Sequence, residues 1–127
     1  MTTSPIVTRS CCTTPSAMGF WTAMFALFYA VGLLVRSIVP ALQPYGDTVI
    51  LTALAAACVV NLRRNRTLHC GLTAPLFAIA AIVAGLIEAG LLRFDERVMW
   101  GVVIVGVAIA FLVEWRTVGR QRRASNA

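Results

Sequence analysis

Four long apolar runs dominate the pattern of hydrophobic and polar positions along the chain. They cover residues 17–42, 48–62, 70–92 and 98–115, and short polar stretches separate them. A helix needs ~20 mostly apolar residues to cross a hydrocarbon core of about 30 Å, so the runs predict four membrane-spanning helices. The second run has only 15 residues, and it must extend into its flanks to cross a bilayer.

The connections between these runs predict how the helices are arranged. All are short, and Pro40, Pro44 and Gly46 mark a helix stop and a turn after the first run. Short connections make sequence neighbours into antiparallel neighbours in space. No linker, repeat or low-complexity tract divides the chain. We therefore expect an all-α fold, a four-helix transmembrane bundle that forms a single integral membrane domain over residues 1–127.

Composition and charge favour a lipid bilayer as the solvent and give the bundle an orientation. The chain is 59% hydrophobic and only 13% charged, which argues against a soluble domain with a polar surface. Its 11 basic residues are all arginine. Three of them, Arg36, Arg93 and Arg97, fall on one side of the predicted bundle. The other eight fall on the opposite side: Arg9, Arg63, Arg64, Arg66, Arg116, Arg120, Arg122 and Arg123. The positive-inside rule then predicts an N-in/C-in topology with short basic cytoplasmic tails.

The same arginines bear on two further questions, nucleic-acid binding and helix packing. Because they cluster at the ends of the apolar runs, they are typical of orientation signals and lipid headgroup contacts, and we expect no nucleic-acid partner. Helix packing in a membrane depends on small residues that permit close approach. Such residues recur four apart in three of the runs: Ala53 and Ala57, then Ala81, Gly85 and Ala89, then Gly106 and Ala110.

Two charged residues inside the predicted spans need a partner. Arg36 lies near the outer end of the first span, and Glu88 lies near the outer end of the third, so antiparallel packing puts them at similar depth. An unpaired charge in a span costs roughly 3 kcal/mol or more. We therefore expect an intramembrane ion pair between Arg36 and Glu88, serving either to fix helix register or as part of a gate or ion-coupling site.

The cysteines carry the clearest chemical signal. Cys11 and Cys12 precede the first span, Cys58 lies near the end of the second, and Cys70 opens the third directly after His69, the only histidine. The predicted topology gathers all of them at the cytoplasmic face, where disulfides are disfavoured. Thiolate and imidazole are ligands of soft or borderline ions such as Hg(II), Cu(I) or Zn(II). The spacing matches no closed zinc motif, and buried cysteines such as Cys58 also serve as small apolar packing residues.

The segment SCCTTP, residues 10–15, attached to a small polytopic chain, resembles the small mercuric-ion transport proteins of bacterial mercury resistance. The resemblance implies a protein of the bacterial cytoplasmic membrane in which Cys11 and Cys12 accept mercuric ion and pass it to a cytosolic thiol acceptor. Those transporters usually carry a cysteine pair inside the first span, whereas residues 17–42 contain no cysteine. A cytoplasmic delivery site does not need that pair.

Other functions stay open beside uptake or transfer of mercuric ion. One is a non-catalytic subunit of a larger membrane complex, or a homo-oligomer, packed through a stripe such as Gly101, Val105 and Ala108. A second is a proton-coupled small exporter resembling the small multidrug resistance family, with Glu88 as its membrane carboxylate. A third, a membrane thiol oxidoreductase, is disfavoured because the thiols lie on the reducing side. No phosphate-binding, hydrolase or metalloprotease motif is present, so we expect no enzyme.

Overall fold

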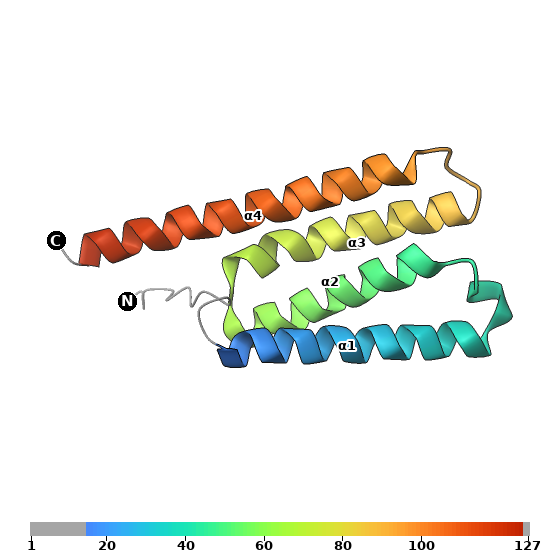
Figure 1. Ribbon diagram of the computed structural model, residues 1–127, viewed down its shortest axis with the longest axis horizontal. Coiled ribbons are helices and arrows are strands. Elements are labelled where there is room, and N and C mark those ends of the chain that lie inside the picture. The colour runs from blue at the N-terminus through green and yellow to red at the C-terminus, as the bar shows by residue number, and fades with distance from the viewer. Residues whose placement is uncertain (1–14, 126–127) are drawn as a thin grey trace, which may run out of the picture.

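Four antiparallel α-helices make up the computed structural model (Figure 1), which describes residues 15–125 apart from the side chains of residues 118, 121–123 and 125. The helices are α1 (Pro15–Ile38), α2 (Gly46–Asn65), α3 (Leu68–Glu88) and α4 (Glu96–Ser125), with a short 3-10 helix, η2 (Pro40–Leu42), after α1. All four are long and apolar enough to span a membrane. The predicted all-α, four-span fold is confirmed, and it indicates a multi-pass membrane protein.

The up-and-down order gives the bundle two distinct ends (Figure 1). At one end α1 begins, α2 passes into α3 through Arg66 and Thr67, and α4 finishes. We call this the thiol end, because Cys58 and Cys70 lie toward it. At the other end lie the turns from α1 to α2 and from α3 to α4. We call it the capped end, after the bonds described below. Which end faces the cytoplasm stays a prediction from the arginines.

Local chemistry explains where the helices end. The first predicted span, residues 17–42, is interrupted because Pro40 cannot continue a helix and drives Val39 into an extended conformation, with φ −106° and ψ 99°. The third, residues 70–92, ends early at Glu88, and Gly90 takes a left-handed φ of 72°. The second does extend into its flanks, from Gly46 to Asn65. The fourth continues to Ser125, so its basic tail is helical.

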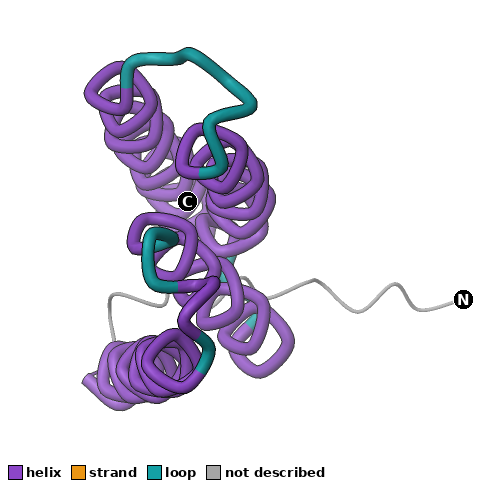
Figure 2. Tube along the Cα trace, turned by 90° about the vertical axis from the view of Figure 1, so that its right-hand side faces the viewer, coloured by secondary structure: helices purple, strands orange, loops and turns teal. Residues whose placement is uncertain are grey.

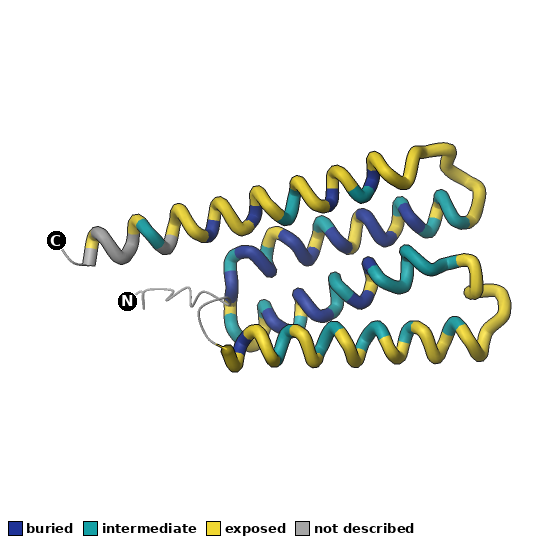
Figure 3. The backbone as a smooth tube through the Cα atoms, viewed as in Figure 1, coloured by how far each residue is buried: buried dark blue, intermediate teal, exposed yellow. Residues whose placement is uncertain are grey.

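The two central helices form the packing core. Figure 3 shows buried positions along α2 and α3, while most of α1 and α4 is exposed. Each helix packs on its sequence neighbour, and within the described residues α1 and α4 do not pack along each other. Figure 2 shows these two helices at opposite ends of the arrangement. The bundle is therefore open between α1 and α4.

Small residues mediate the close contacts, as the sequence predicts. Buried alanines of the predicted stripes include Ala53, Ala57, Ala81 and Ala110. Two glycines permit closer approach still. A Cβ added to Gly32 would lie 2.6 Å from Cγ1 of Val49, and one added to Gly106 would lie 2.6 Å from Cδ2 of Leu76. Glycine thus sets the spacing of α1 on α2 and of α4 on α3.

Candidate thiol and histidine site

Both described cysteines lie together in the core near the thiol end. Cys58 on α2 and Cys70 on α3 are 2% and 0% exposed, and they are neighbours across the helix contact. The tight link between the helices brings them together, because α2 ends at Asn65 with Arg66 in a left-handed conformation and α3 begins at Leu68. Twelve positions apart in sequence, the thiols become neighbours across the α2–α3 contact.

Polar side chains surround the two sulfur atoms. Asn61 Nδ2 donates to Cys70 Sγ at 3.1 Å. Thr73 Oγ1 donates to the His69 carbonyl at 2.9 Å and lies 3.5 Å from Cys58 Sγ. His69 Nε2 lies 3.4 Å from Cys70 Sγ. The thiols therefore occupy a small buried polar cluster rather than a purely apolar packing site.

Glu114 on α4 completes this cluster, and sequence reasoning missed it. Its Oε2 forms an ion pair with His69 Nδ1 and also accepts the His69 backbone N–H at 3.1 Å. Both side chains are buried, and Phe111 stacks on the imidazole with ring centroids 4.7 Å apart. Bonded to Glu114 through Nδ1, the imidazole presents Nε2 to Cys70. The order Glu114, His69, Cys70 makes a connected polar chain from α4 into the core.

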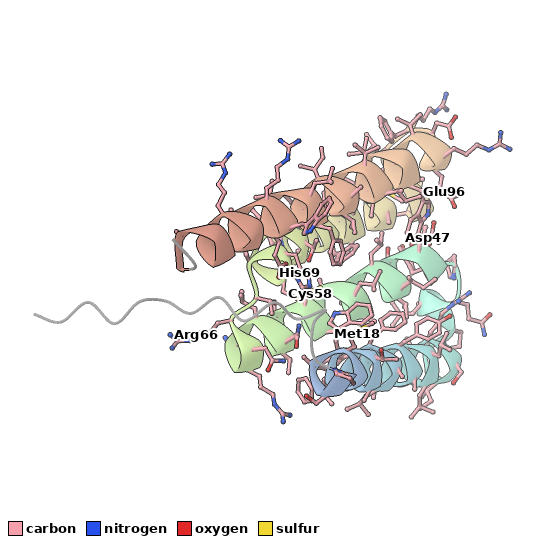
Figure 4. All side chains as sticks on the ribbon, turned by 60° about the vertical axis from the view of Figure 1, so that its left-hand side comes forward. Met18, Asp47, Cys58, Arg66, His69 and Glu96 are labelled. Carbon is pink, nitrogen blue, oxygen red and sulfur yellow. The ribbon has the colours of Figure 1, made fainter. Side chains whose placement is uncertain are left out.

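A cavity of about 250 Å³ adjoins the cluster. It lies between α1 and α4, and residues of α2 and α3 also line it. Figure 4 shows three of the lining residues, Met18, Cys58 and His69, close to one another. Its polar lining consists of Cys58, His69, Thr73 and Thr22. Its apolar lining consists of Met18, Trp21, Leu54, Phe77, Val107 and Phe111. Cys70 does not line it, so Cys58 is the thiol that faces the cavity.

The predicted metal ligands are thus partly brought together. Cys58, Cys70 and His69 meet, while Cys11 and Cys12 lie outside the described residues. Over residues 15–125, no three His, Cys, Asp or Glu side chains are arranged to hold a metal ion. A site built from the described residues alone would have to use the two thiols, with the imidazole in support.

The expected ion pair between Arg36 and Glu88 does not form: among the side chains that the structure describes, the single ion pair is that of His69 with Glu114. Arg36 Nε donates instead to the Gln43 carbonyl at 2.5 Å, in the α1–α2 turn. Glu88 accepts the backbone N–H groups of Asp47 at 2.8 Å and Thr48 at 3.3 Å, and the Thr48 hydroxyl at 2.6 Å. The partial positive charge of the α2 N-terminus replaces the arginine as its counter-charge.

Comparisons with known proteins add no family to this description. No protein-family model matches the chain, and neither the curated proteins nor the solved structures contain a significant match.

Proposed function

We propose that this multi-pass membrane protein handles soft metal ions, and that its role is the uptake or transfer of mercuric ion across a bacterial cytoplasmic membrane. One observation carries the proposal: Cys58 and Cys70 meet in the core, with His69 Nε2 3.4 Å from Cys70 Sγ. Thiolate and imidazole are the donors that soft ions prefer. Two helices that each contribute one thiol form a pair that can hold an ion between them.

The number of available ligands limits which metal ion the site can bind. Zn(II) in structural sites takes four ligands in a tetrahedron, and the described residues offer no group of three. Hg(II) and Cu(I) form linear complexes with two thiolates, so the Cys58 and Cys70 pair supplies a complete ligand set for them. The described residues therefore favour Hg(II) or Cu(I) over Zn(II).

The remaining expected ligands fit a transfer role. Cys11 and Cys12 precede Pro15, the first residue of α1, which begins at the thiol end of the bundle. In the proposed sequence, the buried pair passes the ion to Cys11 and Cys12 by thiol exchange, and a cytosolic thiol acceptor removes it. Each exchange replaces one metal-sulfur bond by another, so no oxidant or reductant is needed.

The test is titration of the reduced, detergent-purified protein with Hg(II) and Cu(I), following thiolate-to-metal absorption. We expect stoichiometric binding that weakens at least about tenfold, or ~1.4 kcal/mol, in the variant Cys58→Ser with Cys70→Ser. Met24→Leu is the control, because it removes a soft sulfur atom on α1 that does not line the cavity. Binding no tighter than that of free thiols refutes the function. Binding lost only on Cys11→Ser with Cys12→Ser refutes the buried pair as a ligand.

The alternatives find less support in the geometry. Glu88 is engaged by two backbone N–H groups and a hydroxyl, which suits a structural carboxylate better than the proton carrier of an exporter. Gly101, Val105 and Ala108 form an exposed stripe on α4, as a subunit of a larger complex requires. A stripe that faces lipid has the same exposure, so the metal titration is the more decisive experiment.

A further inference from the structure

The cavity between α1 and α4 has a mouth and a floor of different character. Met18 and Phe111 at the mouth are 53% and 42% exposed. At the floor, Cys58, Thr73 and Phe77 are 2%, 2% and 7% exposed. Because α1 and α4 do not pack along each other within residues 15–125, the mouth opens sideways between two membrane-spanning helices. A ligand would reach it from the lipid phase.

Size and lining define the class of ligand. An engineered cavity of about 150 Å³ binds benzene, whereas pockets for drug-sized molecules begin at roughly 300 Å³. At about 250 Å³, this cavity suits one substituted ring. Trp21, Phe77 and Phe111 contribute three aromatic walls, which favour stacking or edge contacts with a flat ring. No charged side chain other than the paired His69 lines it, so the ligand is uncharged.

The reactive group at the floor is a dithiol. Cys58 lines the cavity, and Cys70, its neighbour on α3, is fully buried and does not line it. Two neighbouring thiols give up two electrons and two protons when they form a disulfide. A flat, uncharged, lipid-soluble ring that accepts two electrons and two protons is a quinone.

We infer that the cavity is a quinone site and that the Cys58 and Cys70 thiols reduce the quinone bound there. Both S–H bonds break and one S–S bond forms between Cys58 and Cys70. The two electrons and the two protons pass to the quinone, whose two carbonyl oxygens become the hydroxyls of a hydroquinone. Cys58 contacts the ring because it lines the cavity, and Cys70 completes the disulfide from behind.

Burial separates the Cys58 and Cys70 thiols from the aqueous compartments on both sides of the membrane. From the sequence alone, a thiol oxidoreductase is disfavoured because the predicted topology puts the thiols on the reducing side of the membrane. In the structure Cys58 and Cys70 are at most 2% exposed and lie inside apolar helices, beside a space that opens toward lipid. A membrane quinone is therefore their nearest redox partner. The inference goes beyond the proposed metal function and uses the same two thiols.

The experiment uses the full chain with Cys11→Ser and Cys12→Ser, so that Cys58 and Cys70 are the only thiols. The reduced protein in lipid nanodiscs is mixed anaerobically with decylubiquinone, whose fully substituted ring offers thiols no open carbon for addition. Quinone absorbance and peptide mass mapping are followed together. We expect one hydroquinone for each Cys58–Cys70 disulfide, and no reduction in Cys70→Ser.

A second variant tests the cavity without touching a thiol. Val107→Phe fills the cavity from α4, and Ile104→Phe adds the same side chain to a position on α4 that is 65% exposed. We expect Val107→Phe to slow quinone reduction at least about tenfold and Ile104→Phe to leave it unchanged. Intact free thiols without quinone consumption overturn the inference. Equal rates in Val107→Phe and Ile104→Phe also overturn it, because the reaction would then occur elsewhere.

The metal titration keeps the two proposals apart. Metal binding without quinone reduction leaves the proposed function standing and removes the quinone site. Quinone reduction without metal binding supports the quinone site and refutes the proposed metal function. The folding of Cys70→Ser and of Val107→Phe is checked by circular dichroism and thermal unfolding. Val107→Phe still tests the cavity if Cys70→Ser fails to fold.

Discussion

At each end of the bundle, a glutamate from one helix caps the start of another helix, but the surroundings of the two glutamates differ. At the capped end, Glu88 from α3 accepts the first backbone N–H groups of α2. At the thiol end, Glu114 from α4 accepts the His69 backbone N–H near the start of α3. Each carboxylate satisfies N–H groups that a helix start leaves without intrahelical partners. Each also ties two helices together.

The two ends differ in the burial of the carboxylate and in its further hydrogen-bond partners. Glu88 is half-buried, and its third partner is a hydroxyl, while nearby Trp100 Nε1 donates to Asp47 Oδ2 at 3.1 Å. Glu114 is buried, and its further partner is an imidazole whose other ring nitrogen lies 3.4 Å from the Cys70 thiol. A glutamate that caps the start of a neighbouring helix thus has a structural role by itself. Such a glutamate becomes part of a candidate functional site only where titratable and nucleophilic side chains adjoin it.

The largest loss of stability is expected when the carboxylate at the thiol end is removed. Glu114→Ala leaves His69 buried without its ion-pair partner, and loss of one partner of a buried pair costs ~3 to 5 kcal/mol. Thermal unfolding in detergent should show this loss, with Arg116→Ala, an exposed neighbour on α4, as the control. The double variant Glu114→Leu with His69→Leu should recover part of the stability, because it removes both charged partners and leaves only the backbone N–H of residue 69 without its acceptor. A loss no larger than that of Arg116→Ala would contradict the role of Glu114.

The matching change at the capped end should cost less. Glu88→Ala removes a cap from a half-buried helix start, where water or lipid headgroups can replace part of the lost bonding, so we expect about 1 to 2 kcal/mol. Glu88→Gln keeps an oxygen acceptor and should lose roughly half as much, which separates hydrogen bonding from charge. Unfolding measured under the same conditions checks the order. If Glu88→Ala destabilised the protein more than Glu114→Ala, the assignment of the two ends would be reversed.

Two glycines test how α1 and α4 attach to the central helices, and one of them, Gly106, should give the smallest effect of all. Gly32→Ala puts a methyl group against Val49, whose branched side chain has few rotamers in a helix, so we expect a cost of ~1 to 3 kcal/mol. Gly106→Ala meets the far end of the flexible Leu76 side chain, and we expect less than about 1 kcal/mol. Val49→Ala combined with Gly32→Ala should relieve the first cost. Equal losses in the two single variants would show that neighbour flexibility does not decide the outcome.

The partners of the charged side chains mark where sequence reasoning succeeded and where it failed. Matching depth in antiparallel spans suggested Arg36 with Glu88, yet α2 stands between them and its N-terminus takes the carboxylate. The same depth argument applied to His69, at the start of α3, and Glu114, near the end of the fourth span, would have found the true pair. Depth narrows the choices, but the direction in which a side chain leaves its helix decides among them.

The lengths of the hydrophobic runs predict the four spans, and Pro40, Pro44 and Gly46 predict the turn after the first of them, because both are local properties of the chain. Small-residue spacing likewise identified packing positions such as Ala57 and Ala110, since small side chains permit close approach of two helices. Only the tertiary structure decided that Cys58 meets Cys70, that Glu114 holds His69, and that α1 and α4 leave a cavity between them. These features depend on rotation about the helix axes and on packing across helices, which no single helix encodes.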